Sequence, residues 1–256
     1  MHDFTEDILT GILSNFLFAL LIIFIGWLTY YFTERRKLLK FFGISSSKRL
    51  VIYISNLRIT QGGSIGIDGK SRSFSGTTVV YREQLMANAF RERFNYLVPS
   101  LSDSKSFFRK ILFADIDVTI LTSPIKIDEI ESNSSILSFG SPGYNIASKY
   151  IEEDDSSTVQ FENDNSEIGI SNLPKMNDSQ IGFIQRLNIN RDNNQRSLFY
   201  TAGLTEQGTI GAAFYLLTNW KKLRKKYKDE DSFVIVLRFP SRNIGEFTID
   251  LERKIE

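Results

Sequence analysis

The residue types in this chain limit the chemistry that it can perform. Its 256 residues include no cysteine and a single histidine, His2, near the N-terminus. Disulfides, thiolate metal sites and cysteine nucleophiles are therefore excluded, and neither a histidine base nor a metal site built from several histidines is expected. Carboxylates, hydroxyls and lysines remain as the reactive groups. We accordingly expect no metal site, and a binding protein is favoured over an enzyme.

Two glycine-containing turns are the segments best suited to hold a ligand. The first contains Gly140, Ser141, Pro142, Gly143 and Asn145, between a predicted strand and a predicted short helix. Glycine lets a ligand approach the backbone, and N–H groups at a helix start can bind an anion. The turn matches neither the dinucleotide pattern G-x-G-x-x-G nor a P-loop. A tight strand-to-helix turn explains the Pro-Gly pair equally well.

The second turn runs from Gly203 to Thr209, between a predicted strand and the longest predicted helix after residue 48. Gly203, Gly208 and Thr209 are its ligand-binding candidates, and Thr209 could cap the helix or present its hydroxyl to a ligand. A capped helix packed closely on a sheet is the alternative. Because parallel strands end at one edge of a sheet, we expect the two turns to converge there and to share an anion.

Glutamates are the only catalytic candidates, and no catalytic residue is assigned with certainty. Glu206 lies in the second turn, and Glu83 opens a predicted helix. A glutamate in a nucleotide pocket can stabilise a ribosyl cation, as glycosidic chemistry requires. More often, a glutamate at a helix start is favoured by the helix dipole. Arg186 alternates with apolar neighbours on a predicted strand, a pattern more typical of an exposed strand-face arginine than of a phosphate ligand.

The pattern of apolar residues predicts the elements that must position these groups. Apolar β-branched runs predict buried strands, and helical spacing predicts two longer helices. Strands alternate with helices, which favours an α/β fold with a Rossmann-like, mostly parallel sheet and helices on its faces. Short strands between 158 and 187 predict an antiparallel excursion. The main predicted strands are 50–54, 117–121, 135–139 and 233–239, the helices are 81–96 and 208–226, and Gly62, Gly63, Gly66 and Gly69 mark a loop or hairpin.

These segments together resemble a group of bacterial Rossmann-like ligand-binding domains. The resemblance covers roughly residues 48–240 and rests on a strand followed by GSPGYN and a helix, then IGFIQRLNI, then FYTAGLTEQGTIGAAFYLL. Domains of that group are attached to membrane helices or other modules, and some are linked to anti-phage signalling. The resemblance implies a ligand site, but no catalytic residue and no particular ligand. The residues that it implies line the site are Gly140, Pro142, Asn145, Gly203, Gly208 and Thr209.

The N-terminal region predicts a membrane span. Residues 8–33 carry no charge, and the stretch ends in an aromatic cluster at 27–31. A helix of about 20 apolar residues crosses a bilayer, and aromatic rings favour its interface. A cleaved signal peptide should begin with positive charge. Here three acids precede the stretch, so we predict a retained transmembrane helix.

Charges beside this helix predict its orientation and the division of the chain. Arg35, Arg36, Lys37 and Lys40 follow the span, and the positive-inside rule then places the N-terminus outside the cell. Residues 1–43 form the helix and its basic flank, and 43–47 form a flexible tether. Residues 48–256 form a cytoplasmic α/β domain whose core is independent of the span.

The combined features predict a single-pass protein of the cell membrane, a sensor or effector. Its domain is expected to bind a small anionic ligand, a nucleotide being favoured, without any certain cofactor, and to signal through homo-oligomers. A net charge of +1 offers no basic excess for a nucleic-acid partner. Two alternatives stay open: a membrane-anchored enzyme that hydrolyses a nucleotide or NAD-like substrate with a glutamate, and a scaffold domain that binds nothing.

Overall fold

The computed structural model describes residues 2–44, 49–58, 64–65, 71–72, 77–96, 117–124, 126–131, 133–162, 166–171, 175–178, 180–191, 194–240 and 243–255. The predicted loop glycines at 62, 63, 66 and 69 lie outside these residues. The elements are, in order, α1 (His2–Phe41), β1 (Arg49–Ile54), β2 (Asn56–Arg58), β3 (Ser64–Ile65), β4 (Ser71–Arg72), β5 (Thr77–Val79), α3 (Tyr81–Tyr96), β6 (Asp117–Thr122), the short 3-10 helix η1 (Ile127–Glu129), β7 (Ser135–Phe139), α5 (Ile146–Glu152), β8 (Val159–Glu162), β9 (Glu167–Ile170), β10 (Ile181–Arg191), β11 (Asn194–Gly203), α6 (Glu206–Lys226), β12 (Ser232–Arg238) and β13 (Thr248–Ile255).

A central sheet of seven strands organises the fold, in the order β13-β12-β10-β11-β7-β1-β6. The four strands β11, β7, β1 and β6 are parallel to one another. β10 is antiparallel to β11 and β12, and β13 is antiparallel to β12. Most strands therefore point the same way, which confirms the predicted α/β class with a mostly parallel sheet. The β8–β9 hairpin is antiparallel, as predicted for this region.

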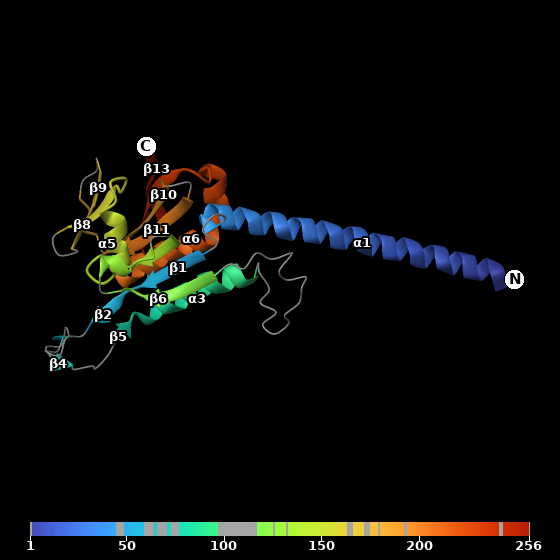
Figure 1. The fold of residues 1–256 in the computed structure, drawn as a ribbon, viewed down its shortest axis with the longest axis horizontal. Coiled ribbons are helices and arrows are strands. Elements are labelled where there is room, and N and C mark those ends of the chain that lie inside the picture. The colour runs from blue at the N-terminus through green and yellow to red at the C-terminus, as the bar shows by residue number, and fades with distance from the viewer. Residues whose placement is uncertain are drawn as a thin grey trace.

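Both faces of the sheet are covered, as the apolar strand sequences require. β7 is buried at every position, and β1 is buried after its first residue. Strands of this kind occur where elements pack on both sides of a parallel sheet. One face packs against α3, α6 and the end of α1, and the other packs against α5 and the β8–β9 hairpin (Figure 1).

The long helix α1 has two parts with opposite surroundings. Figure 1 shows it projecting from the α/β domain, and its segment Leu13–Phe41 is long and apolar enough to cross a membrane. Large apolar side chains between Leu13 and Tyr30 are exposed, about half or more of each in most cases. The final turns instead enter the domain, where Leu38, Phe41 and Phe42 are at most 1% exposed.

The entry of α1 into the core corrects the predicted boundary at residue 48. Leu38, Phe41 and Phe42 belong to the same buried cluster as the inward side chains of β1, β7 and α6. Gly43 follows with a left-handed φ of +69°, and a Cβ there would lie 2.6 Å from the Ser197 nitrogen. The core therefore depends on the end of α1, whereas 45–48 of the expected tether lie outside the described residues.

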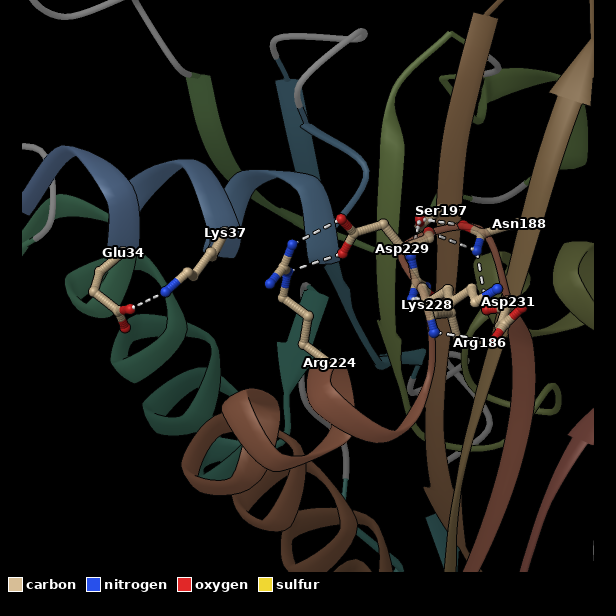
Figure 2. Close-up of polar contacts among 9 residues, drawn as sticks. All are labelled: Glu34, Lys37, Arg186, Asn188, Ser197, Arg224, Lys228, Asp229 and Asp231. Carbon is tan, nitrogen blue, oxygen red and sulfur yellow. Dashed lines mark hydrogen bonds and ion pairs between the residues drawn. The ribbon is translucent and has the colours of Figure 1, made fainter. Parts of the chain in front are cut away.

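Arg186 lies beneath the end of α1, and the expectation that its side chain is exposed was wrong. Its side chain is fully buried, and the guanidinium carbon lies 4.9 Å from the centre of the Phe41 ring. The guanidinium donates to the carbonyl oxygens of Lys228 and Asp229 (Figure 2). Burial lowers the pKa of Arg186 to about 10. A charge buried under aromatic rings is stabilised by cation–π attraction and by hydrogen bonds to carbonyls, so Arg186 fastens β10 beneath α1.

Candidate functional site

The two glycine turns leave the sheet at the same edge. β7 and β11 are parallel neighbours, and Phe139 pairs with Thr201. Directly after this pair, the Gly140 N–H donates to the Thr201 carbonyl at 3.0 Å. The expected convergence of the turns is therefore present in the geometry, and the contacts of each turn decide what this edge can bind.

In the first turn, Asn145 ties strand ends together. Its side chain is fully buried, and its Nδ2 donates to the carbonyl oxygens of Phe139 at 2.7 Å and Tyr53 at 3.2 Å. Its Oδ1 accepts the Ala147 N–H at 2.9 Å and so caps α5. The Ile146 N–H donates to the Ser123 hydroxyl at 2.7 Å. Because the chain itself pairs these two N–H groups, the start of α5 does not offer them to an anion.

In the second turn, the capping residue is Thr205 rather than the expected Thr209. The Thr205 hydroxyl accepts the Gly208 N–H at 3.3 Å. Thr209 is buried, and its hydroxyl accepts the Gly203 N–H at 3.1 Å. A Cβ on Gly208 would lie 2.3 Å from the Ile181 oxygen, and one on Gly203 would lie 2.7 Å from the Gly208 Cα. These contacts support the close-packing interpretation of the turn.

Glu83 is the most buried carboxylate at this edge. Its Oε2 accepts the Ser55 N–H at 2.8 Å and its Oε1 accepts the Ser55 hydroxyl at 3.1 Å, so it joins α3 to the end of β1. Burial raises its pKa to about 7, and the charge of Glu206 adds to that rise. Gly140 has a φ of +88°, and a Cβ there would lie 3.0 Å from Glu83 Oε1.

Glu206 reaches the same edge but in a different environment. It is exposed, and its carboxylate lies 3.7 Å from an Arg82 guanidinium nitrogen. The two candidate glutamates therefore come near each other, although one braces the backbone and the other lies in solvent. The Glu83 carboxylate beside Gly140 disfavours an anion at this point when it is ionised, because like charges repel.

A cavity of about 220 Å³ lies beside the first turn. It lies beyond the carboxyl ends of β1, β6 and β7. The chain leaves the ends of β1 and β7 toward opposite faces of the sheet, because β1 leads through α3 to β6 and β7 leads into α5. Ligands of open α/β sheets bind at this kind of point, beyond the carboxyl ends of the strands. The lining residues are Asn56, Ser123, Pro124, Pro142, Gly143, Tyr144, Asn145 and Ile146.

Asn56 is the residue in this cavity with unused hydrogen-bonding capacity. Its Nδ2 donates to the Ser123 carbonyl at 3.1 Å, which fixes the orientation of the amide. Its Oδ1 is buried and has no hydrogen-bond partner among the described residues. An unpaired buried acceptor is costly and invites a donor. At the same cavity, the Tyr144 side chain is 56% exposed and offers an aromatic face.

The sequence analysis did not select Asn56 or Ser123. Ser123 directly follows β6, and Asn56 lies two residues after the end of β1, where it begins β2. The carboxyl ends of β1 and β6 meet at this edge, and this strand-end position is the signal that could have identified both residues. Of the predicted residues, Pro142, Gly143 and Asn145 line the cavity. Gly203, Gly208 and Thr209 do not line it, and Gly140 and Ser141 lie in the adjoining turn.

A partly buried carboxylate lies on the α5 face of the sheet. Glu152 accepts hydrogen bonds from the Tyr200 hydroxyl at 3.1 Å and the Phe161 N–H at 3.0 Å. Burial raises its pKa to about 7. These contacts connect α5 to β8 and β11. Within the described ranges, no group of three or more acidic or histidine side chains is arranged to hold a metal ion.

Comparison of the chain with protein-family models, with curated proteins and with solved structures finds no match. The functional argument therefore rests on the geometry of the chain itself.

Proposed function

We propose that this chain is a membrane-anchored binding protein. In this proposal α1 spans the bilayer, and the α/β domain takes a small nucleoside-like ligand in the cavity beside Asn56 and Tyr144. Supporting the anchor, the apolar side chains of α1 before its final turns are exposed, which in water would leave a large uncovered apolar surface. Supporting the ligand site, the cavity lies where a Rossmann-like sheet holds its ligand.

The observation that carries the ligand proposal is the unpaired Asn56 Oδ1. A movement of the Asn56 side chain toward the cavity would let this oxygen accept an N–H or O–H donor, such as a base amine or a ribose hydroxyl, and the exposed ring of Tyr144 suits stacking with a planar base. Because the N–H groups of Ile146 and Ala147 are already paired, a nucleotide would bind through its base or sugar. Its phosphates would then extend into solvent.

Binding of nucleosides and nucleotides to the full-length protein in detergent tests this proposal. We expect Tyr144→Ala and Asn56→Ala each to weaken binding about tenfold, since a stacked base or a buried hydrogen bond is worth roughly 1–3 kcal/mol. Ile249→Ala is the matched control, because Ile249 is an exposed apolar residue on β13, across the sheet from the cavity. Absence of binding across the panel, or equal losses in all three variants, would refute the ligand site.

The proposed orientation places the α/β domain in the cytoplasm. Arg35, Arg36, Lys37 and Lys40 follow the exposed part of α1, and cytoplasmic flanks are enriched in such residues. A reporter fused after Glu256 should be active in the cytoplasm. Activity only outside the cytoplasm would reverse the orientation.

We further propose that ligand binding is transmitted through self-association. A single helix cannot form a pore, so any effect on the membrane requires several copies. Cross-linking of the full-length protein in membranes, with and without a ligand found in the panel, should show a change in oligomer size. An unchanged distribution of oligomer sizes would show that ligand binding is not transmitted through self-association.

A further inference from the structure

The end of α6 lies against α1 at the level of its aromatic cluster. Lys221 forms an ion pair with Glu34 of α1, and its Nζ also lies 6.0 Å from the centre of the Tyr30 ring. Tyr30 is 62% exposed and belongs to the aromatic cluster at 27–31, a feature typical of a membrane interface. If α1 spans the bilayer as proposed above, the last turns of α6 therefore lie at headgroup level. Figure 1 shows the end of α6 beside the base of the projecting part of α1.

Exposed cations lie at this level and along the following turns of α1. Lys222 and Lys225 of α6 and Arg36 and Lys40 of α1 are all exposed. No ion pair is recorded for these four among the described residues, whereas neighbouring cations are neutralised. Lys221 pairs with Glu34, Arg224 with Asp229 and Lys226 with Glu252.

The spacing of these cations places them in neighbouring pairs on α6 and on α1. Lys225 lies one helical turn after Lys221 and shares its face of α6, and Lys222 is the next residue around the helix. Arg36 and Lys40 are likewise one turn apart on α1. The acids that pair with neighbouring cations, Glu34, Asp229 and Glu252, are each occupied by an ion pair. Positive charge therefore prevails around the base of α1.

We propose that Arg36, Lys40, Lys222 and Lys225 form a basic collar that binds anionic phospholipid headgroups of the bilayer crossed by α1. Basic side chains beside a membrane helix attract anionic lipids, and the attraction falls off within a Debye length. The collar rests on the proposed membrane anchor and adds a lipid preference to it. Binding would hold α6 against the bilayer and limit tilting of the domain.

Energy transfer in lipid nanodiscs tests the collar. Because the chain has no cysteine, Thr218→Cys gives a single labelling site, exposed and one turn before Lys222. A donor dye at this site is combined with trace acceptor-labelled lipid, either phosphatidylserine or phosphatidylcholine, in discs of both lipids. We expect at least threefold more transfer to the anionic lipid at low salt, since each nearby lysine or arginine is worth roughly a fivefold preference. This excess should fall as salt is raised.

A charge-matched comparison locates the effect. The variant Arg36→Gln, Lys222→Gln, Lys225→Gln should lose most of the anionic excess. The control Lys126→Gln, Lys149→Gln, Lys175→Gln removes the same number of exposed cations near η1, α5 and β8, on the side of the domain away from α1, and should retain it. Equal transfer to both lipids in the wild type, or an unchanged excess in the collar variant, overturns the collar while leaving the anchor intact. Transfer to neither lipid overturns the anchor and the collar with it.

Discussion

The dependence of the domain core on the end of α1 can be tested by truncation. A fragment of residues 34–256 keeps Leu38, Phe41 and Phe42, whereas a fragment of 45–256 removes all three. Each is at most 1% exposed in the core. Replacing a buried leucine or phenylalanine by alanine costs about 2–5 kcal/mol, so losing three costs about 6–15 kcal/mol, although neighbouring contributions do not add strictly. This is comparable with the whole stability of a domain, about 5–15 kcal/mol.

The aromatic contacts of Phe41 suggest that removing the end of α1 lowers the unfolding free energy by an amount near the upper end of the range for three buried side chains. Its ring packs 5.5 Å from the Phe199 ring centre and also covers the buried Arg186 guanidinium at 4.9 Å. Removing it would leave a buried cation with fewer partners. We therefore expect the shorter fragment to unfold or aggregate without detergent.

Near-ultraviolet circular dichroism and urea unfolding of the two fragments provide the assay. The longer fragment should show one cooperative transition and the shorter one should show none. In the longer fragment, Arg36→Ala with Lys40→Ala is the control, because these residues are exposed on the same turns and should change the unfolding free energy little. A shorter fragment as stable as the longer one would show that α1 only rests on the domain.

Three further predictions concern the sheet edge. Gly208→Ala should destabilise the domain by about 2 kcal/mol or more, because its Cβ would lie 2.3 Å from a backbone oxygen; Gly245→Ala, with 3.2 Å to a flexible side chain, should cost less in the same urea titration. Glu83 ionises near pH 4.5 when unfolded and near 7 when folded, so the folded state binds more protons between these values. Its ionisation should therefore lower the unfolding free energy by up to about 3 kcal/mol as pH rises through this window, and Glu83→Gln should remove this share of the pH dependence while leaving that of Glu152. Thr205→Ala should cost about 1 kcal/mol through the lost helix cap, and Thr205→Ser should restore it; equal melting temperatures for both variants would contradict the capping role.

The sequence predicted the elements better than their surroundings. Runs such as Leu50–Ile54 are β-branched and apolar throughout, and they form buried strands because both faces of the parallel region are covered. The start of α6 was predicted within two residues, although Thr209 was the residue named as a possible cap and the structure places Thr205 there. Thr205 directly precedes α6, and Thr209 lies in its first turn. Only the backbone conformation shows which of the two caps the helix.

Burial of polar side chains could not be read from local pattern. Arg186 alternates with apolar residues as an exposed strand residue would, yet β10 has strands on both sides and the end of α1 above it. Asn145 was expected to contact a ligand, but it satisfies backbone groups of two strands that are distant in sequence. In each case the partners come from separate parts of the chain, so a local pattern carries no signal for them.

The continuity of α1 also determines how neighbouring copies would face one another. A helix of 40 residues is about 60 Å long, and here it enters the domain without a swivel. Any rotation of the helix about its axis must turn the attached domain by the same angle. In a pair of copies, the face of α1 that meets its neighbour would fix whether the two cavities point toward or away from each other. Moving that contact by one residue would turn each domain by about 100°. Substitutions among the lipid-facing side chains could thus redirect the domains without altering a single residue within them.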